Sequence, residues 1–144
     1  MTDRAAIQRT KTERDIGALL LRLTVGGLML PHGIDKVTGG IGWMPGALEA
    51  KGVPGFVAYG VYLGEVVAPL LMLFGLAMRT SAAAIAFTML MAVYVAHADE
   101  VFSLGEHGEY ALELQMLFAV GAVCAALVGP GRFSVPSPAW LKRF

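Results

Sequence analysis

Four long apolar runs dominate the sequence, and each contains at most one Asp, Glu, Lys or Arg. They cover residues 16–34, 55–78, 81–98 and 111–128. Each run is long enough to cross the ~30 Å hydrocarbon layer of a bilayer as a helix. The period-two alternation of strands is absent, and backbone in lipid must satisfy its hydrogen bonds within helices or closed barrels. The pattern predicts an all-α, polytopic integral membrane protein with a bundle of four transmembrane helices.

The boundaries of these runs divide the chain into three parts. We expect an N-terminal segment at residues 1–15, a membrane domain at 16–134 and a tail at 135–144. The first run lacks a clear cleavage site, so we expect it to be retained as a helix rather than removed as a signal peptide. The connection Met78–Thr80 predicts a tight turn between antiparallel helices. The longer connection at 35–54 is rich in glycine around Trp43, which predicts a lid lying flat on the membrane interface.

Charge outside the helices predicts the orientation. Eight Lys and Arg residues lie on the side that holds both termini and the second connection, against two on the other side. The positive-inside rule therefore predicts that both termini are cytoplasmic. The opposite side is acidic and contains Asp35, Glu49, Asp99, Glu100, Glu106 and Glu109.

Composition narrows the classes of partner. Hydrophobic residues make up 56% of the chain and charged residues 15%, which indicates that much of the surface contacts the lipid bilayer. Basic and acidic residues balance at 11 each, so no basic field favours nucleic acid. Cys124 is the single cysteine, which excludes an intramolecular disulfide and a dithiol redox pair. Four helices with polar groups to cover favour a protein partner or a homo-oligomer.

Two ionisable residues in the predicted spans require an explanation, because a charge there costs about 2.5–3.5 kcal/mol. At 1.5 Å per residue, Arg22 and Glu65 lie at depths that differ by roughly 6 Å, which predicts an ion pair. The pair either fixes the register of the bundle or binds or protonates a ligand. Small residues beside Arg22, and Pro69 four residues after Glu65, favour a shaped site.

A second group of polar residues lies at the predicted outer end. His32, His97 and Glu113 are candidate ligands for a metal ion, although no local spacing pairs them. Tyr94 shares a helix face with His97, and we include Tyr94 and His32 among the candidate ligand-binding residues. Interfacial histidines that bond to loops are the commoner arrangement, so a metal or haem site is the less favoured interpretation.

Several short motifs resemble those of the DoxX family. They are Arg22-Leu23-Thr24-Val25-Gly26, His32-Gly33-Ile34-Asp35-Lys36, Gly52-Val53-Pro54, Gly64-Glu65, Leu73-Phe74-Gly75-Leu76, Arg79 and Gly129-Pro130-Gly131-Arg132-Phe133-Ser134. The resemblance covers about residues 16–134, and no family motif accounts for His97 or for the acidic stretch from Glu106 to Glu113. It implies a four-helix protein of the bacterial inner membrane. Members of that family are linked to thiosulfate and quinone oxidoreductase complexes and to redox or metal handling.

Three functions follow as hypotheses. The first is a subunit or accessory of a quinone-linked redox system, in which Arg22 and Glu65 hold a quinone head group or relay its protons. The second is a non-enzymatic membrane adaptor that uses the acidic face or the 35–54 connection. The third is a small transporter or metal-handling protein that uses the outer histidines.

Overall fold

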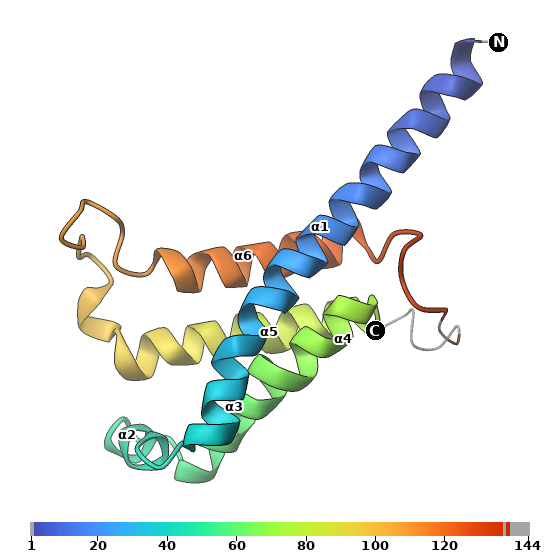
Figure 1. Ribbon diagram of the computed structural model, residues 1–144. Helices are drawn as coiled ribbons and strands as arrows, with labels where there is room; N and C mark the ends of the chain where they lie inside the picture. Colours follow the sequence, from blue (N-terminus) through green and yellow to red (C-terminus); the bar gives the residue numbers. More distant parts are fainter. Residues whose placement is uncertain (1, 137, 139–144) are drawn as a thin grey trace.

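Helices form nearly all of the regular structure in the computed structural model, which describes residues 2–136 and 138 (Figure 1). No named strand occurs in this part of the chain, and a single isolated bridge joins Leu104 to Tyr110. The elements in chain order are α1 (Thr2–Gly39), α2 (Met44–Ala50), η1 (Gly55–Tyr59), α3 (Gly60–Tyr62), η2 (Leu63–Val67), α4 (Ala68–Phe74), α5 (Met78–Ala96), η3 (Ala98–Glu100) and α6 (Glu113–Val128).

Three stretches are long and apolar enough to cross a membrane. They are 6–39 within α1, the continuous helical stretch 55–74, and α5. The fourth, α6, is an apolar helix of 16 residues. The all-α membrane architecture expected from the sequence is therefore confirmed, with three helices long enough to span a membrane and a fourth apolar helix, α6, that is shorter.

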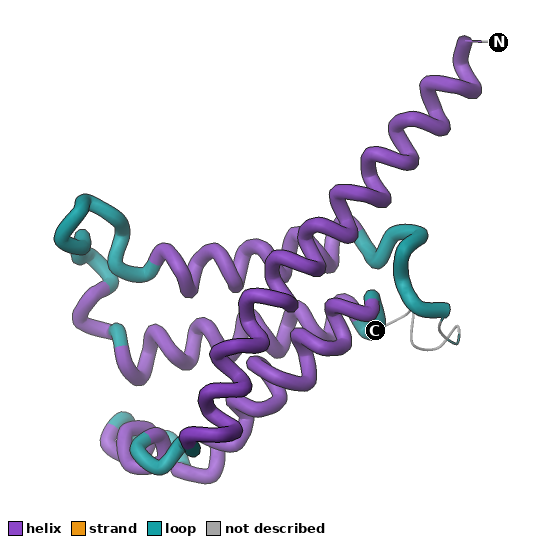
Figure 2. The backbone as a smooth tube through the Cα atoms, in the orientation of Figure 1, coloured by secondary structure: helices purple, strands orange, loops and turns teal. Residues whose placement is uncertain are grey.

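The first helix begins earlier and ends later than the apolar run suggests. It starts at Thr2 rather than Ile16, and its N-terminal part extends beyond the other helices (Figure 2). This polar part contains good helix formers and an ion pair between Arg9 and Glu13, four residues apart. At the other end the helix continues to Gly39, so Lys36 is helical instead of belonging to a loop.

The second span changes its helical winding along its length. It begins as the 3₁₀ helix η1, passes through a π-helical turn at η2, and continues as α4. In the π turn the Ala68 N–H bonds to the Leu63 carbonyl, five residues earlier. Pro69 follows directly and cannot donate a backbone hydrogen bond, which favours such an irregular turn.

The turn between the second and third spans lies at 75–77 rather than at Met78–Thr80, which is already helical. Gly75 ends α4 in the left-handed conformation with φ of 73°. The Leu76 N–H bonds back to the Leu71 carbonyl, as expected of a helix that terminates at glycine. The expected tight connection exists, displaced by three residues toward this glycine.

The main core lies where α1, α4, α5 and α6 meet. Its buried members are Val25, Met29, Ala68, Met72, Met78, Ala82, Ile85, Met89, Phe118, Ala122 and Ala125. Several are alanines, which allow the helix axes to approach closely. The methionines fill the remaining irregular gaps.

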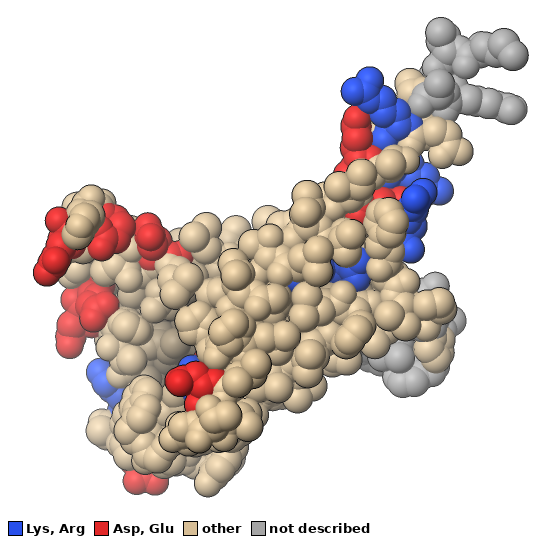
Figure 3. Space-filling view, in the orientation of Figure 1, with Lys and Arg blue, Asp and Glu red and all other residues tan. Residues whose placement is uncertain are grey.

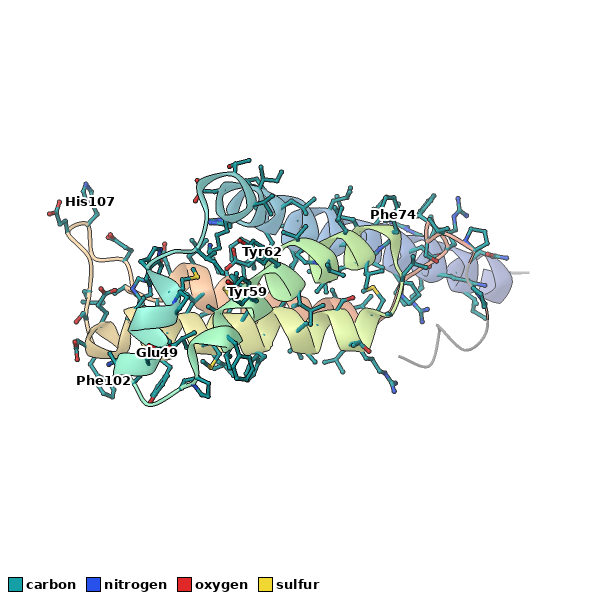
Figure 4. All side chains as sticks on the ribbon, turned by 90° about the horizontal axis from the view of Figure 1, so that it is seen from below. Glu49, Tyr59, Tyr62, Phe74, Phe102 and His107 are labelled. Atoms are coloured by element: carbon teal, nitrogen blue, oxygen red, sulfur yellow. The ribbon has the colours of Figure 1, made fainter. Side chains whose placement is uncertain are left out.

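The two ends of the bundle differ in charge and in construction. At one end, the C-terminal segment contacts the helices, because the Arg132 N–H donates to Asp15 and the Val135 N–H donates to the Phe74 carbonyl. The other end holds the segment 98–112, where acidic side chains gather, while basic ones lie along the N-terminal part of α1 (Figure 3). Figure 4 shows Phe102 and His107 at this acidic end and Phe74 at the opposite end.

The connection expected to form a lid contains the short helix α2. Ile41 and Leu48 are buried and pack with Ala58 of η1 in a small second core. The Tyr94 hydroxyl of α5 donates to the Lys51 carbonyl at 3.2 Å, which ties this connection to the third span. The segment therefore forms a wall against α5 and η1.

Candidate functional site

Glu65 forms an ion pair inside the bundle, with a partner that differs from the predicted one. Its Oε2 lies 2.7 Å from Nζ of Lys36, and the Glu65 side chain is only 6% exposed. The expected pairing of Glu65 with Arg22 was wrong. In the sequence, Lys36 follows the first apolar run and was expected in the loop after it, whereas α1 continues past the last apolar residue and brings Lys36 to Glu65.

Arg22 has a different set of partners near the other end of the bundle. It is fully buried, and its guanidinium donates from Nη1 to the Leu73 carbonyl at 3.1 Å and from Nη2 to the Phe133 carbonyl at 3.2 Å. These carbonyls belong to the end of α4 and to the C-terminal segment. Arg22 thus fastens the C-terminal segment to the bundle, and its geometry is that of a structural clamp.

Two glycines allow the backbone around Glu65 to pack tightly. A Cβ on Gly33 of α1 would collide with the Glu65 carbonyl, and one on Gly64 would collide with the Thr88 side chain of α5. The π turn η2 is therefore held between α1 and α5 without intervening side chains. This close approach, together with the Tyr62 hydroxyl donating to the Lys36 carbonyl at 3.3 Å, positions the ion pair.

A large apolar cavity opens on one side of the ion pair. Its volume is about 330 Å³. Most of its walls come from α2, η1, η2 and α5, and Lys36, Glu65 and His97 supply its charged or titratable groups. Apolar lining residues include Trp43, Leu48, Val57, Phe87, Met91 and Val95.

A smaller and more polar cavity borders the same ion pair. Its volume is about 180 Å³, and Lys36, Glu65 and His97 border it as well. Its remaining polar groups are His32 of α1 and Gln115 of α6. The Gln115 Oε1 atom is buried and accepts no hydrogen bond from the described part of the chain. Gln115 was missed by the sequence analysis, where an uncharged residue in an apolar run gave no signal.

The remaining candidates are distributed between the cavities and the surface. His32 borders the smaller cavity, and its ring packs edge-on against Phe118 with centroids 5.8 Å apart. His97 borders both cavities, and its Nδ1 lies 2.9 Å from Oε2 of Glu100. Tyr94 bonds to the Lys51 carbonyl and is nearly half exposed, so it supports the wall formed by the α2 segment.

The structure does not assemble the expected metal ligands. Among the described residues, no three His, Cys, Asp or Glu side chains are grouped so that they could hold a metal ion. Glu113 is exposed at the start of α6, while His32 and His97 face the smaller cavity. The sequence predicted all three at the same end of the bundle, but residues at one end need not have their donor atoms close together.

The arrangement suits a ligand with an apolar body and a polar head. An apolar chamber of this size excludes water from the body, and a few convergent polar groups at its end fix the orientation of the head. The Lys36 ammonium donates hydrogen bonds, whereas the Glu65 carboxylate accepts them and can carry a proton.

Comparisons with known proteins agree with these features. The DoxX family profile matches residues 17–98. The chain is 31% identical over 125 residues to the inner membrane protein YqjF of Escherichia coli. The aligned region covers 87% of this chain and 93% of that protein. The chain is also 31% identical over 103 residues to a Bacillus subtilis protein named "Putative oxidoreductase CatD", covering 69% of this chain and 74% of that one. No solved structure matches the chain significantly.

Proposed function

The chain belongs to the DoxX family of membrane proteins, and from that premise we propose that it is a subunit or accessory of a membrane redox system whose Lys36–Glu65 site binds a lipid-soluble quinone. One observation carries this proposal: a buried ion pair stands at the polar end of an apolar cavity of about 330 Å³. The name of the Bacillus subtilis relative, a proposed oxidoreductase, is consistent with it.

The chemistry of a quinone fits the two parts of the cavity. A quinone has carbonyl oxygens that accept hydrogen bonds, and a ring with an isoprenoid chain that prefers an apolar environment. Lys36 would donate to a carbonyl of the head group, and Trp43, Leu48 and Val57, which line the cavity, would surround the apolar body.

When bound, a quinone supplies two-electron redox chemistry that the side chains of this protein lack. The single cysteine, Cys124, cannot form a dithiol, so the electrons come from a partner subunit or its donor. The role of this chain is to bind the head group, to exclude water from it and to exchange protons at the Glu65 carboxylate.

The same proposal includes a location and an orientation. We place the protein in the bacterial cytoplasmic membrane with both termini in the cytoplasm, as the distribution of Lys and Arg favours. The ion pair lies toward the end that holds α2 and the segment 98–112, so the site is reached from the outer half of the membrane. A protein partner or a second copy covers part of the remaining apolar surface.

Organic extraction of the protein purified from its native membrane tests the proposal. We expect the extract to contain quinone, identified by its ultraviolet absorption and its mass, in near-stoichiometric amount. Glu65→Gln keeps the shape but removes the charge and the proton, and should lose most of this quinone. The matched control is Glu13→Gln, which removes a carboxylate from the exposed Arg9–Glu13 pair in the part of α1 that extends beyond the bundle.

The result separates this proposal from the adaptor hypothesis. An adaptor predicts an extract without quinone, or an amount that Glu65→Gln and Glu13→Gln leave equal. That outcome would contradict a quinone site and favour a protein that acts only by stabilising its partner. The metal-handling hypothesis has no grouped set of ligands among the described residues.

A further inference from the structure

The smaller cavity differs in chemistry from the larger one although the two share the ion pair. Four polar or titratable residues in addition to Glu65 border it: His32, Lys36, His97 and Gln115. Its volume of about 180 Å³ is enough for several water molecules, since each occupies roughly 30 Å³ in the liquid.

Gln115 indicates what fills this cavity. Its Oε1 atom is buried and has no donor within the described part of the chain. A buried amide oxygen without a hydrogen bond loses its hydration without compensation, so such atoms are normally bonded to ordered water or to a ligand. The cavity is polar enough to hold that water, because Lys36, Glu65 and the histidine rings offer further partners.

His97 extends the polar path from this cavity to the surface. Its side chain is 34% exposed and borders the smaller cavity. On its other side, Nδ1 bonds to Glu100, whose side chain is 48% exposed in η3. Glu65 and His97 therefore border the same cavity, and Glu100 is bonded to His97 toward the acidic end of the bundle.

We propose that the smaller cavity is a water-filled route that connects Glu65 with the acidic end of the bundle, with His97 and Glu100 at its mouth. This inference rests on the proposed function, because the role of the route is to supply protons to Glu65 while the quinone occupies the larger cavity. Protons reach the carboxylate through water and the imidazole of His97, so the apolar chamber itself stays dry.

Carbodiimide cross-linking in the intact, lipid-embedded protein tests this route. The reagent activates the Glu65 carboxylate, and the Lys36 amine then displaces the urea to form an amide. The carbodiimide takes up the elements of water that the ion pair loses. The distance of 2.7 Å between Nζ and Oε2 favours this link without a spacer. Mass spectrometry of the digested protein detects it.

Two reagents distinguish access through water from access through lipid. We expect a water-soluble, cationic carbodiimide to form the Lys36–Glu65 link when it is added from the acidic side. His97→Phe places an apolar ring at the mouth, and Gln115→Leu removes the buried acceptor, so each should abolish the link with this reagent. His107→Phe, in the same connection but outside both cavities, should leave it intact. Dicyclohexylcarbodiimide, which enters through lipid, should form the link in all these variants.

The outcomes separate the route from the quinone site. Linking by dicyclohexylcarbodiimide alone in the unmodified chain, or equal linking in all variants by the water-soluble reagent, would overturn the route. Failure of both reagents would contradict the ion pair and, with it, the quinone site. A link that depends on His97, in a protein that binds no quinone, would support the route and refute only quinone as the ligand of the larger cavity.

Discussion

At the scale of single residues, the site depends on which charged groups meet inside the bundle. Lys36 and Glu65 form the pair, while Arg22 bonds to two backbone carbonyls. The sequence identified Glu65 and Arg22 as buried, because charges within apolar runs are conspicuous. It missed Lys36 because the apolar run ends before it. The helix continues there because its end packs on the second span, where Gly33 of α1 lies close against the backbone of Glu65.

A double-mutant cycle distinguishes the two possible pairings. We expect Lys36→Met and Glu65→Gln to be non-additive in their effect on the free energy of unfolding in detergent. Each single change leaves one buried charge unpaired, at a cost of about 3–5 kcal/mol in comparable pairs, and the double change leaves none. Arg22→Met and Glu65→Gln should be additive, because the two side chains share no bond. Coupling of Arg22 with Glu65, and not of Lys36 with Glu65, would refute the observed pairing.

At the scale of elements, the site depends on the irregular second span. A regular helix through 55–74 is what an apolar run with one proline suggests, and the sequence pointed to Pro69 only as favouring a shaped site near Glu65. The π turn at Leu63–Val67 and the 3₁₀ start at Gly55–Tyr59 were not predictable, because they follow from how η2 fits between α1 and α5. The hydrophobic pattern predicts the span, whereas the local winding of this span follows from the packing of glycine against the neighbouring backbone.

Two glycines of α1 provide a matched test of this packing. Gly33→Ala should lower the thermal stability, because its Cβ meets the rigid Glu65 carbonyl and forces the helices apart, at about 1–3 kcal/mol. Gly27→Ala introduces the same methyl group where nothing lies within 4 Å, and should be neutral or stabilising by up to about 1 kcal/mol. Thermal unfolding in detergent measures both. Equal effects of the two substitutions would show that α1 and η2 are not in close contact at Gly33.

At the scale of the whole molecule, the two ends of the bundle have different roles. One end fastens the C-terminal segment through Arg22 and Asp15. The other carries the ion pair, both cavities and the acidic connection. Hydropathy alone predicted the class of fold and the membrane, because few folds satisfy their backbone in lipid. The cavities could not be predicted, since the walls of the smaller one come from side chains up to 89 positions apart in the sequence, from Met29 to Phe118.

Reporter fusions test the orientation of these ends. With both termini in the cytoplasm, a reporter that is active only in the periplasm should be inactive when fused after Phe144 and active when inserted near Gly105. The excess of Lys and Arg on the side of the termini is the physical reason. The reverse pattern would place the mouth of the water-filled route on the cytoplasmic side.

The central claim is that the large cavity binds a quinone at the Lys36–Glu65 pair, and Trp43 provides a direct measurement. Trp43 borders this cavity, and the chain has two tryptophans, so Trp140→Phe leaves it as the only tryptophan. Titration with a quinone should quench its fluorescence to saturation in lipid nanodiscs. Adding Glu65→Gln should weaken the affinity roughly tenfold or more, because it removes the charged hydrogen bond that holds the Lys36 ammonium at the head group. Glu13→Gln should leave the affinity unchanged. Quenching that does not saturate, or an affinity that is the same in both variants, would contradict the account.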